Sequence, residues 1–509
     1  MSCSRLLAGL LLLAPLLTFV ACGGSSSSDL PPGPAAIRTL AYAVTDCHGD
    51  ATGESASQRL EILQGDRPAV TVLELPTVRY PALGLCALSG RVGIGSNFTF
   101  FAPFQRLGVS PDGSGVVFEV TLDLSLVPLL GGNPLSPDQE GIFFVRADGS
   151  GLWRLGPASR EPAQRLSGIT STSSECGATI FGYPFFSFSP DGRTIAFMDR
   201  GPGPAGEDAP QVVTIDIASG TRTVLTHLPD APTDPSFPAE PATALPNFPD
   251  DNTIQFFSRA NPDGLNAEGA PREFTVKTDG TGLTILPAPV ARSGSQVVQT
   301  FSITIPVGNA EVTTLLLRGT PVNPNPCNPP FYNTILPDVF VLSPDHILQL
   351  TNFHRIDTND AQGTPLPLTT DGQHVFFIAS PDPLGTNPSE NCQVFSIDTL
   401  GADLRQLTQF RAADHSAEGC NAFSEQPGCF IASAPILDPE LRTLVINTDC
   451  DPLGTNPKNG GQYFAMHTDG TGLRQLTATQ GIVTAADGSV DVELPGPGAY
   501  SAPGFGGLL

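Results

Sequence analysis

A strand motif in two parts recurs six times along this chain, and it constrains the fold more than any other feature. The first part is a turn around Pro-Asp or Asp-Gly between two apolar runs, clearest at Phe186–Phe197 and Leu107–Phe118. The second part is an apolar strand that ends in Asp-Gly-Thr/Ser-Gly-Leu, as in Phe143–Leu152. The two kinds of turn alternate, with a spacing of about 65 residues within each series. Such a repeat indicates stacked or radial supersecondary units.

The segments between these turns have the composition of β-strands. They are short and rich in Val, Ile, Phe and Thr, as at Gln211–Ile215, Thr253–Phe257 and Val375–Ile378. The 51 prolines and 53 glycines suit turns and oppose helices. Each unit is therefore predicted to be two hairpins, which form a four-stranded antiparallel sheet. Since such a sheet cannot bury both faces alone, radial packing into an all-β β-propeller is the expected fold.

The length of the repeat region sets the expected number of blades. Residues 36–495 make seven blades at about 65 residues each. Strand candidates occur near both chain ends, and one blade built from both ends would close the ring without exposed edges. Six blades remain the alternative if the N-terminal strands form an appendage. Residues 496–509 are predicted to be a tail rich in Gly and Pro. The terminal strand candidates are Ile37–Val44, Arg59–Leu63, Val70–Leu75, Ile482–Ala485 and Ser489–Leu494.

The repeats resemble the WD40-like Asp-Pro propeller repeats of the TolB family and of the propeller domain in prolyl oligopeptidase-type enzymes. The resemblance depends on Ser189–Gly192 with Ile195–Phe197, on Ser110–Gly113 and on Asp469–Thr477. It covers most of residues 107–480 and implies a propeller. TolB carries an α/β domain before its propeller, for which this chain has no room, so a role in the Tol–Pal machinery is not expected.

The N-terminus has the features of an export signal. The basic Arg5 precedes the apolar run Leu6–Val20, which is too short to span a bilayer as a mature helix. The run ends in Phe19-Val-Ala-Cys22, which resembles the lipobox of bacterial lipoproteins. We therefore expect residues 1–21 to be removed and Cys22 to be lipidated, with residues 22–35 as a flexible tether. Gly23 after the cysteine favours the outer membrane, by resemblance to known sorting rules.

Eight cysteines remain in the exported chain once Cys3 is removed and Cys22 is acylated. An even number in an exported protein indicates disulfides, although sequence cannot fix their connectivity. The favoured pairings are Cys420–Cys429, Cys47–Cys86, Cys392–Cys450 and Cys176–Cys327.

Two sets of acidic residues are candidates for chemistry. The aspartates of the repeated turns, such as Asp112, Asp191, Asp279 and Asp469, are expected to cap their own turns rather than bind ligands.

A loop with the sequence Asp-Pro-Leu-Gly-Thr-Asn-Pro occurs twice, from Asp382 and again from Asp451. Its carboxylates, together with Asp449, suggest a structural Ca²⁺ site. The simpler interpretation is that the loop is an inherited copy. Its Asp and Asn then cap turns, and the adjacent cysteines crosslink neighbouring segments.

Three functional hypotheses follow from these sequence features. The first is a non-catalytic binding or scaffold lipoprotein for a protein, peptide or glycan partner, because no catalytic motif such as G-x-S-x-G or H-E-x-x-H is present. The second is a propeller hydrolase or lyase that acts on envelope or extracellular polymer, with catalytic groups from several blades. The third is a scaffold stabilised by calcium. The formal charge of −25 argues against a nucleic acid partner and against binding of anionic lipid by charge.

Overall fold

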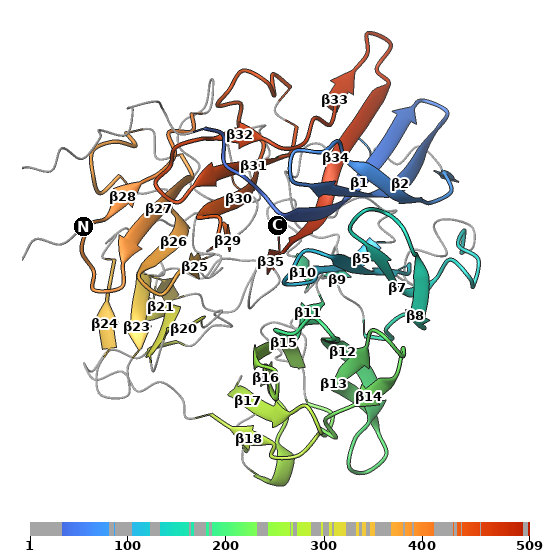
Figure 1. Ribbon diagram of the computed structural model, residues 1–509, viewed down its shortest axis with the longest axis vertical. Helices are drawn as coiled ribbons and strands as arrows, with labels where there is room; N and C mark the ends of the chain where they lie inside the picture. Colours follow the sequence, from blue (N-terminus) through green and yellow to red (C-terminus); the bar gives the residue numbers. More distant parts are fainter. Residues whose placement is uncertain are drawn as a thin grey trace, which may run out of the picture. The chain divides into compact units, whose positions relative to one another are not determined.

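The computed structural model is built almost entirely from β-strands (Figure 1). It describes residues 33–80, 86, 104–122, 133–161, 164–166, 180–182, 186–231, 243–264, 266–267, 272–286, 297–298, 305–307, 310–321, 332–334, 338–342, 347–351, 368–379, 382–388, 391–411, 431, 435–438, 440–458, 460–501 and 507–508. Residues 34–509 form one compact unit. Within the described ranges no helix has the length and apolar character needed to traverse a lipid bilayer.

Five sheets have four antiparallel strands each, in chain order, as the paired turns predict. The first contains β5 (Phe104–Val109), β6 (Gly115–Val120), β7 (Gly141–Arg146) and β8 (Trp153–Gly156). The second contains β11 (Ser187–Phe188), β12 (Thr194–Pro202), β13 (Asp208–Asp216) and β14 (Arg222–Val224). The third contains β15 (Thr243–Asp250), β16 (Thr253–Ser258), β17 (Arg272–Lys277) and β18 (Thr284–Ile285), with the 3₁₀ turn η1 (Pro262–Gly264) between β16 and β17. The fourth contains β25 (Leu368–Thr370), β26 (His374–Ala379), β27 (Gln393–Asp398) and β28 (Arg405–Gln406). The fifth contains β29 (Ile436–Asp438), β30 (Thr443–Thr448), β31 (Gln462–His467) and β32 (Arg474–Gln475).

Three further sheets depart from this plan, so the prediction of seven four-stranded blades is corrected to five such sheets among the described residues. One reason is the long strand β21, which pairs with four shorter strands in a six-stranded sheet. That sheet contains β19 (Val297–Val298), β20 (Ile305–Val307), β21 (Ala310–Pro321), β22 (Tyr332–Thr334), β23 (Asp338–Leu342) and β24 (Ile347–Gln349). A small two-stranded sheet contains β9 (Gln164–Leu166) and β10 (Ile180–Gly182).

The last sheet joins the two ends of the chain and is called the chain-end sheet below. It contains β1 (Thr39–Asp50), β2 (Gly53–Gln64), β3 (Val70–Glu74), β4 (Val78–Tyr80), β33 (Gly481–Thr484), β34 (Val490–Tyr500) and β35 (Gly507–Leu508). β1 pairs with β34 in antiparallel register from Leu40 opposite Tyr500 to Gly49 opposite Val490. In Figure 1 the blue N-terminal strands therefore lie beside the red C-terminal strands. The expected sheet shared by both ends is present.

The chain-end sheet extends past the expected domain boundary at residue 495. β34 continues to Tyr500, and β35 adds to it, so part of the predicted tail belongs to the sheet. The strand passes through Pro495, Gly496 and Pro497 because the register shifts between Tyr42 and Val44. A bulge of this kind accommodates prolines that a regular ladder would exclude.

Alternating side chains of inner strands pack on the two neighbouring sheets. In β26, Val375 and Phe377 pack toward β23 of the six-stranded sheet, and Phe376 and Ile378 pack toward β30 of the next sheet. Burial on both faces explains why these strands are nearly continuous apolar runs.

Six apolar clusters connect the sheets in succession. They lie between β19–β24 and β25–β28, between β25–β28 and β29–β32, between β29–β32 and the chain-end sheet, between that sheet and β5–β8, between β5–β8 and β11–β14, and between β11–β14 and β15–β18. Antiparallel sheets packed face to face in succession form an all-β, propeller-like arrangement.

Candidate functional site

The duplicated loop predicted from the sequence joins the second and third strands of two neighbouring sheets. In the first copy, the backbone N–H of Asn387 donates to Oδ1 of Asp382 at 2.7 Å. In the second copy, the N–H of Asn456 donates to Oδ1 of Asp451 at the same distance. Each aspartate therefore caps its own loop, as the simpler interpretation of these residues predicts.

The loop asparagines fix the base of each copy. The side-chain amide of Asn456 donates to the carbonyl oxygens of Asp449, Cys450 and Gly460, at 3.1, 3.2 and 2.7 Å. Asn387 donates in the same way to the carbonyl oxygen of Asn391 at 2.8 Å. These buried amides make both loops rigid, because they satisfy backbone groups that water cannot reach.

The predicted calcium ligands do not converge on a shared centre. Asp382 and Asp451 belong to loops of different sheets, and Asp449 is buried beneath the second loop. Within the described ranges no group of three or more His, Cys, Asp and Glu side chains has the geometry to hold a metal ion. Calcium binding thus stays a prediction.

A third copy of the loop was missed in the sequence. Asn261, Pro262, Gly264 and Asn266 match the Asp/Asn-Pro-x-Gly-x-Asn spacing, between β16 and β17. The N–H of Asn266 donates to Oδ1 of Asn261 at 2.6 Å, and its side-chain amide donates to the Ala260 carbonyl at 3.2 Å. The signal was the spacing of the two asparagines, which the change from Asp to Asn concealed.

The two predicted loops present the same apolar residue at the same position. Leu384 and Leu453, the third residues of the copies, are 43% and 44% exposed although they are large and hydrophobic. Cys392 and Cys450, which flank the two loops, lie in a single apolar cluster. The loops therefore lie on the same rim of neighbouring sheets, and this rim is called the leucine rim below.

The repeated turn aspartates act as predicted. Oδ1 of Asp469 accepts hydrogen bonds from the backbone N–H and the hydroxyl of Thr471, at 2.9 and 2.6 Å. Asp279 accepts the same pair from Thr281 at 2.9 and 2.6 Å. The threonine hydroxyl bond is the main reason that the pKa of each aspartate lies below its ordinary value. These residues stabilise turns and do not form a ligand ring.

A buried glutamine–threonine network was not foreseen. Gln393 begins β27, and Thr408 follows β28; the Thr408 hydroxyl donates to Oε1 of Gln393 at 2.7 Å and accepts the N–H of Val394 at 2.9 Å. Gln393 also bonds both backbone groups of Phe410, at 2.7 and 2.9 Å. The same bonds recur where the spacing of 15 residues recurs, at Gln211 with Thr226 and at Gln462 with Thr477.

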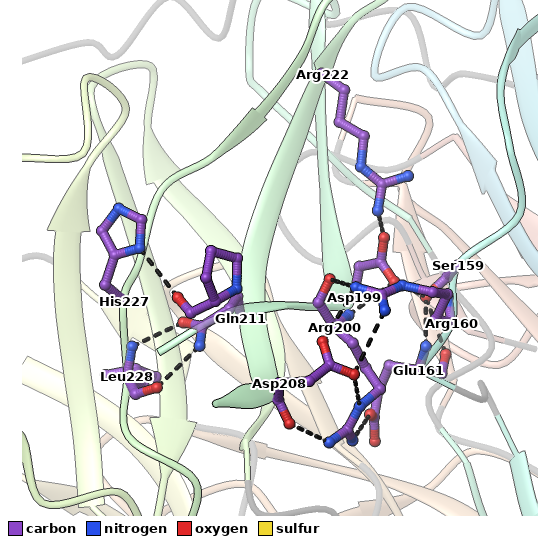
Figure 2. Close-up of polar contacts among 11 residues, drawn as sticks. Ser159, Arg160, Glu161, Asp199, Arg200, Asp208, Gln211, Arg222, His227 and Leu228 are labelled. Carbon is purple, nitrogen blue, oxygen red and sulfur yellow. Dashed lines mark hydrogen bonds and ion pairs between the residues drawn. The ribbon is translucent and has the colours of Figure 1, made fainter. Parts of the chain in front are cut away.

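Charged side chains, of which Arg106, Glu119, Glu161 and Asp199 are buried, join the β5–β8 sheet to the β11–β14 sheet, and Figure 2 shows most of the set. Oδ1 of Asp199 accepts the backbone N–H groups of Arg160 and Arg200, both at 2.7 Å, and Asp199 is ion-paired with Arg222. Arg200 pairs in turn with Glu161 and Asp208, at 3.0 Å each.

On the β5–β8 side, buried Arg106 is ion-paired with buried Glu119 and donates to the Glu161 carbonyl at 2.6 Å. Four arginines thus face four acids in this junction. The equal numbers of arginines and acids indicate that these ion pairs fix the two sheets to each other, because buried charges are tolerated only when they are paired. The sequence signal was a charge inside an apolar strand, Glu119 in β6 and Asp199 in β12.

The predicted disulfide between Cys47 and Cys86 is confirmed, with a Cα–Cα distance of 5.6 Å. Cys392 and Cys450 are buried and disulfide-bonded, and the pairing predicted between them stays a prediction. The lipidation residue Cys22 and the predicted pairs Cys420–Cys429 and Cys176–Cys327 lie outside the described residues.

Two histidines of the described residues are paired with carboxylates. Nδ1 of His48 lies 2.6 Å from Asp491, and Nδ1 of His374 lies 3.1 Å from Asp371. Both pairs are solvent-accessible and belong to different sheets. The first joins β1 to β34, and the second lies in the turn before β26.

No protein-family model matches this chain. No curated protein matches it in sequence. Among solved structures, the chain is similar to an oligogalacturonate lyase from Vibrio parahaemolyticus, with 11% identity over 82% of this chain and 95% of that one and a TM-score of 0.39. It is similar to TolB from Acinetobacter baumannii, with 14% identity over 94% and 89% of the two chains and a TM-score of 0.34.

The β-propeller domain of the Trilobed protease from Pyrococcus furiosus is also similar, with 11% identity over 75% of this chain and 87% of that one and a TM-score of 0.38. TolB and a β-propeller domain are therefore among the solved structures to which this chain is similar. At this level of similarity, the fold assignment depends on the strand pairing and sheet packing described above.

Proposed function

We propose that this chain is a cell-envelope lipoprotein whose propeller is a non-catalytic binding or scaffold module for a protein, peptide or glycan partner. One observation carries the proposal: the leucine rim presents Leu384 and Leu453 on matched, rigid loops of neighbouring sheets. Rigid loops with exposed apolar tips favour binding, because little side-chain and backbone freedom is lost when a partner covers them.

The proposed anchor is an acylated Cys22 in the outer membrane, and the support for it is the sequence before that residue. The proposed ring has seven positions. The five four-stranded sheets occupy five, and the six-stranded sheet and the chain-end sheet occupy the other two. The support for this number is the succession of six apolar clusters through these seven sheets.

Binding at the leucine rim is tested by crosslinking the anchored protein in its own membrane. We expect the double variant Leu384→Ser with Leu453→Ser to lose the partner that the wild-type protein retains. Leu400→Ser is the matched control, because Leu400 is 80% exposed in the turn between β27 and β28, at the opposite end of β27. A partner profile unchanged in the double variant would contradict the proposal.

The anchor has a separate test. Wild-type protein is expected to incorporate labelled fatty acid and to fractionate with membranes, and Cys22→Ser to lose both properties. Wild-type protein without label would contradict lipidation at Cys22.

The alternative function is a propeller hydrolase or lyase for envelope or extracellular polymer. It would require catalytic groups that come from loops of several sheets. Incubation of the purified protein with envelope and extracellular polysaccharides, followed by reducing-end and unsaturated-product assays, distinguishes it from the binding module.

A further inference from the structure

A cavity of about 600 Å³ lies between β32 and the chain-end sheet. Its wall includes Arg474 of β32, Arg59 and Glu61 of β2, Glu493 of β34, and Arg67 in the loop before β3. All of these residues belong to the described part of the chain. The cavity is of the size that binds a small ligand or a short peptide segment.

Two of the carboxylates that line the wall, Glu61 and Glu493, share a single arginine. Arg59 donates from Nε to Glu61 at 2.7 Å and from Nη2 to Glu493 at 2.6 Å, and it is ion-paired with Asp46. Glu61 also accepts the hydroxyl of Tyr42 at 2.7 Å, and Glu493 accepts the backbone N–H of Gln480 at 2.6 Å. Part of the hydrogen-bonding capacity of these two acids is therefore already used.

The other two arginines retain hydrogen-bonding capacity. Nη1 of Arg474 contacts Asp66 at 2.6 Å, and Asp66 is highly exposed. Nε and Nη2 of Arg474 have no hydrogen-bond partner among the described residues and are shielded from solvent at the cavity wall. Among the described residues, the guanidinium of Arg67 donates one hydrogen bond, to the neutral side chain of Gln64 at 3.1 Å. The spare donors of this cavity are thus cationic, in a chain with a net charge of −25.

The repeat supplies an internal comparison. The sequence Leu-Arg-Gln-Leu-Thr occurs at Leu404–Thr408 and again at Leu473–Thr477. In the first copy Arg405 is 60% exposed and pairs with Asp403 at 2.5 Å. In the second copy Arg474 is 22% exposed, because the chain-end sheet packs beside β32. The cavity therefore arises from the joining of the chain ends and not from the repeat itself.

We propose that this cavity is a binding site for a carboxylate-bearing ligand, held by the guanidinium groups of Arg474 and Arg67. The ligand carboxylate displaces Asp66 from Arg474, and a rotation of the guanidinium turns Nε and Nη2 toward it. Arginine suits this role because its planar fork binds a carboxylate through two parallel hydrogen bonds. Neither Leu384 nor Leu453 lines this cavity, so the site goes beyond the proposed function.

The test is isothermal titration of the purified full-length exported chain with three probes at low ionic strength. They are an acetylated tetraglutamate amide, free glutarate and inorganic phosphate. We expect the wild-type protein to bind at least one carboxylate probe, more tightly than phosphate. Binding of the peptide alone identifies an acidic peptide as the ligand class, and binding of glutarate identifies a small carboxylic acid.

Variants locate the binding in the cavity. Arg474→Gln should weaken it tenfold or more, whereas Arg405→Gln, with the same flanking sequence, should leave it unchanged. Asp66→Asn is expected to strengthen it, because the exposed carboxylate that competes for Arg474 is removed; this surface change does not endanger folding. Three outcomes would overturn the proposal. They are no binding of either carboxylate probe, an affinity for phosphate equal to that for carboxylate, and equal carboxylate affinity in Arg474→Gln and Arg405→Gln. None of these outcomes bears on the leucine rim.

Discussion

Two residue types, a buried glutamine and a turn aspartate, fix most of the repeated hydrogen bonds in this protein. A glutamine in the third strand satisfies the backbone beyond the fourth strand in three sheets. In these three sheets the fourth strand is only two or three residues long, so the glutamine stabilises backbone that the strand pairing does not reach.

We expect Gln393→Leu to lower the free energy of unfolding by about 3 kcal/mol, because it leaves the Thr408 hydroxyl and both backbone groups of Phe410 without their buried partner. Gln373→Leu is the control: Gln373 is exposed, and the change should remain within about 0.5 kcal/mol. Denaturant unfolding measures both. A cost for Gln393→Leu no larger than that of the control would contradict the structural role of the network.

The turn aspartates predict an acid-dependent stability. Asp469 has a pKa below its ordinary value of 3.8, chiefly because of the hydrogen bond from Thr471. The folded state therefore binds fewer protons than the unfolded state in this range, so the stabilisation is complete above the ordinary pKa and is lost as pH falls through the lowered one.

In Asp469→Asn this pH-dependent contribution is absent. The urea midpoint of wild-type protein should exceed that of the variant near pH 5, and the difference should shrink as the pH approaches 2. A difference in urea midpoint that is constant, or that grows as the pH falls, would show that Asp469 does not supply the pH-dependent stabilisation.

At the scale of elements, the positions of the strands were predicted accurately from the sequence. The pairing between strands was predicted only in part. Strands such as β13, β16 and β26 were predicted within a few residues, because burial leaves a clear apolar run in the sequence. The chain-end pairing was predicted because both termini contained strand patterns.

The departures from the predicted elements have physical causes. Short additional strands pair with the long strands β21 and β2. Which segment pairs with the edge of a long strand depends on the tertiary fold, and the local sequence pattern does not contain that information. The charge junction and the cavity at Arg474 arise from side chains of different sheets, so their sequence positions carry only weak signals.

The disulfide between Cys47 and Cys86 connects β1 to a residue outside the strands of the chain-end sheet. It closes a loop with a sequence separation of 39, so Cys47→Ser with Cys86→Ser should cost about 4 kcal/mol from the entropy of the unfolded chain. Thermal unfolding of the double variant, beside the wild type with and without reductant, measures this. A melting temperature equal to that of the oxidised wild type would contradict it.

At the scale of the whole molecule, ion pairs reinforce the contact between the chain-end sheet and its neighbour. Nε of Arg38 lies 3.0 Å from buried Asp438, and the hydroxyl of Tyr500 lies 3.3 Å from the same carboxylate. Arg38 precedes β1, Asp438 ends β29 and Tyr500 ends β34. A single buried carboxylate thus connects the first and last long strands to the preceding sheet.

We expect Arg38→Ala to destabilise the protein by about 3 kcal/mol, because Asp438 is left buried without its cation. Arg193→Ala is the control, since Arg193 is exposed and lies 3.8 Å from exposed Asp191. Chemical denaturation compares the two variants. Equal and small effects would show that the contact depends on its apolar cluster alone.

The pairing of Leu40 with Tyr500 also has a consequence for biosynthesis. β1 leaves the ribosome early, but its partner β34 is made only when nearly the whole chain has been translated. Until then β1 has one unpaired edge and an uncovered apolar face, and the closing contact has nearly the largest sequence separation that this chain allows. Closure should therefore be the slow and aggregation-prone step of maturation, because distant pairings form late.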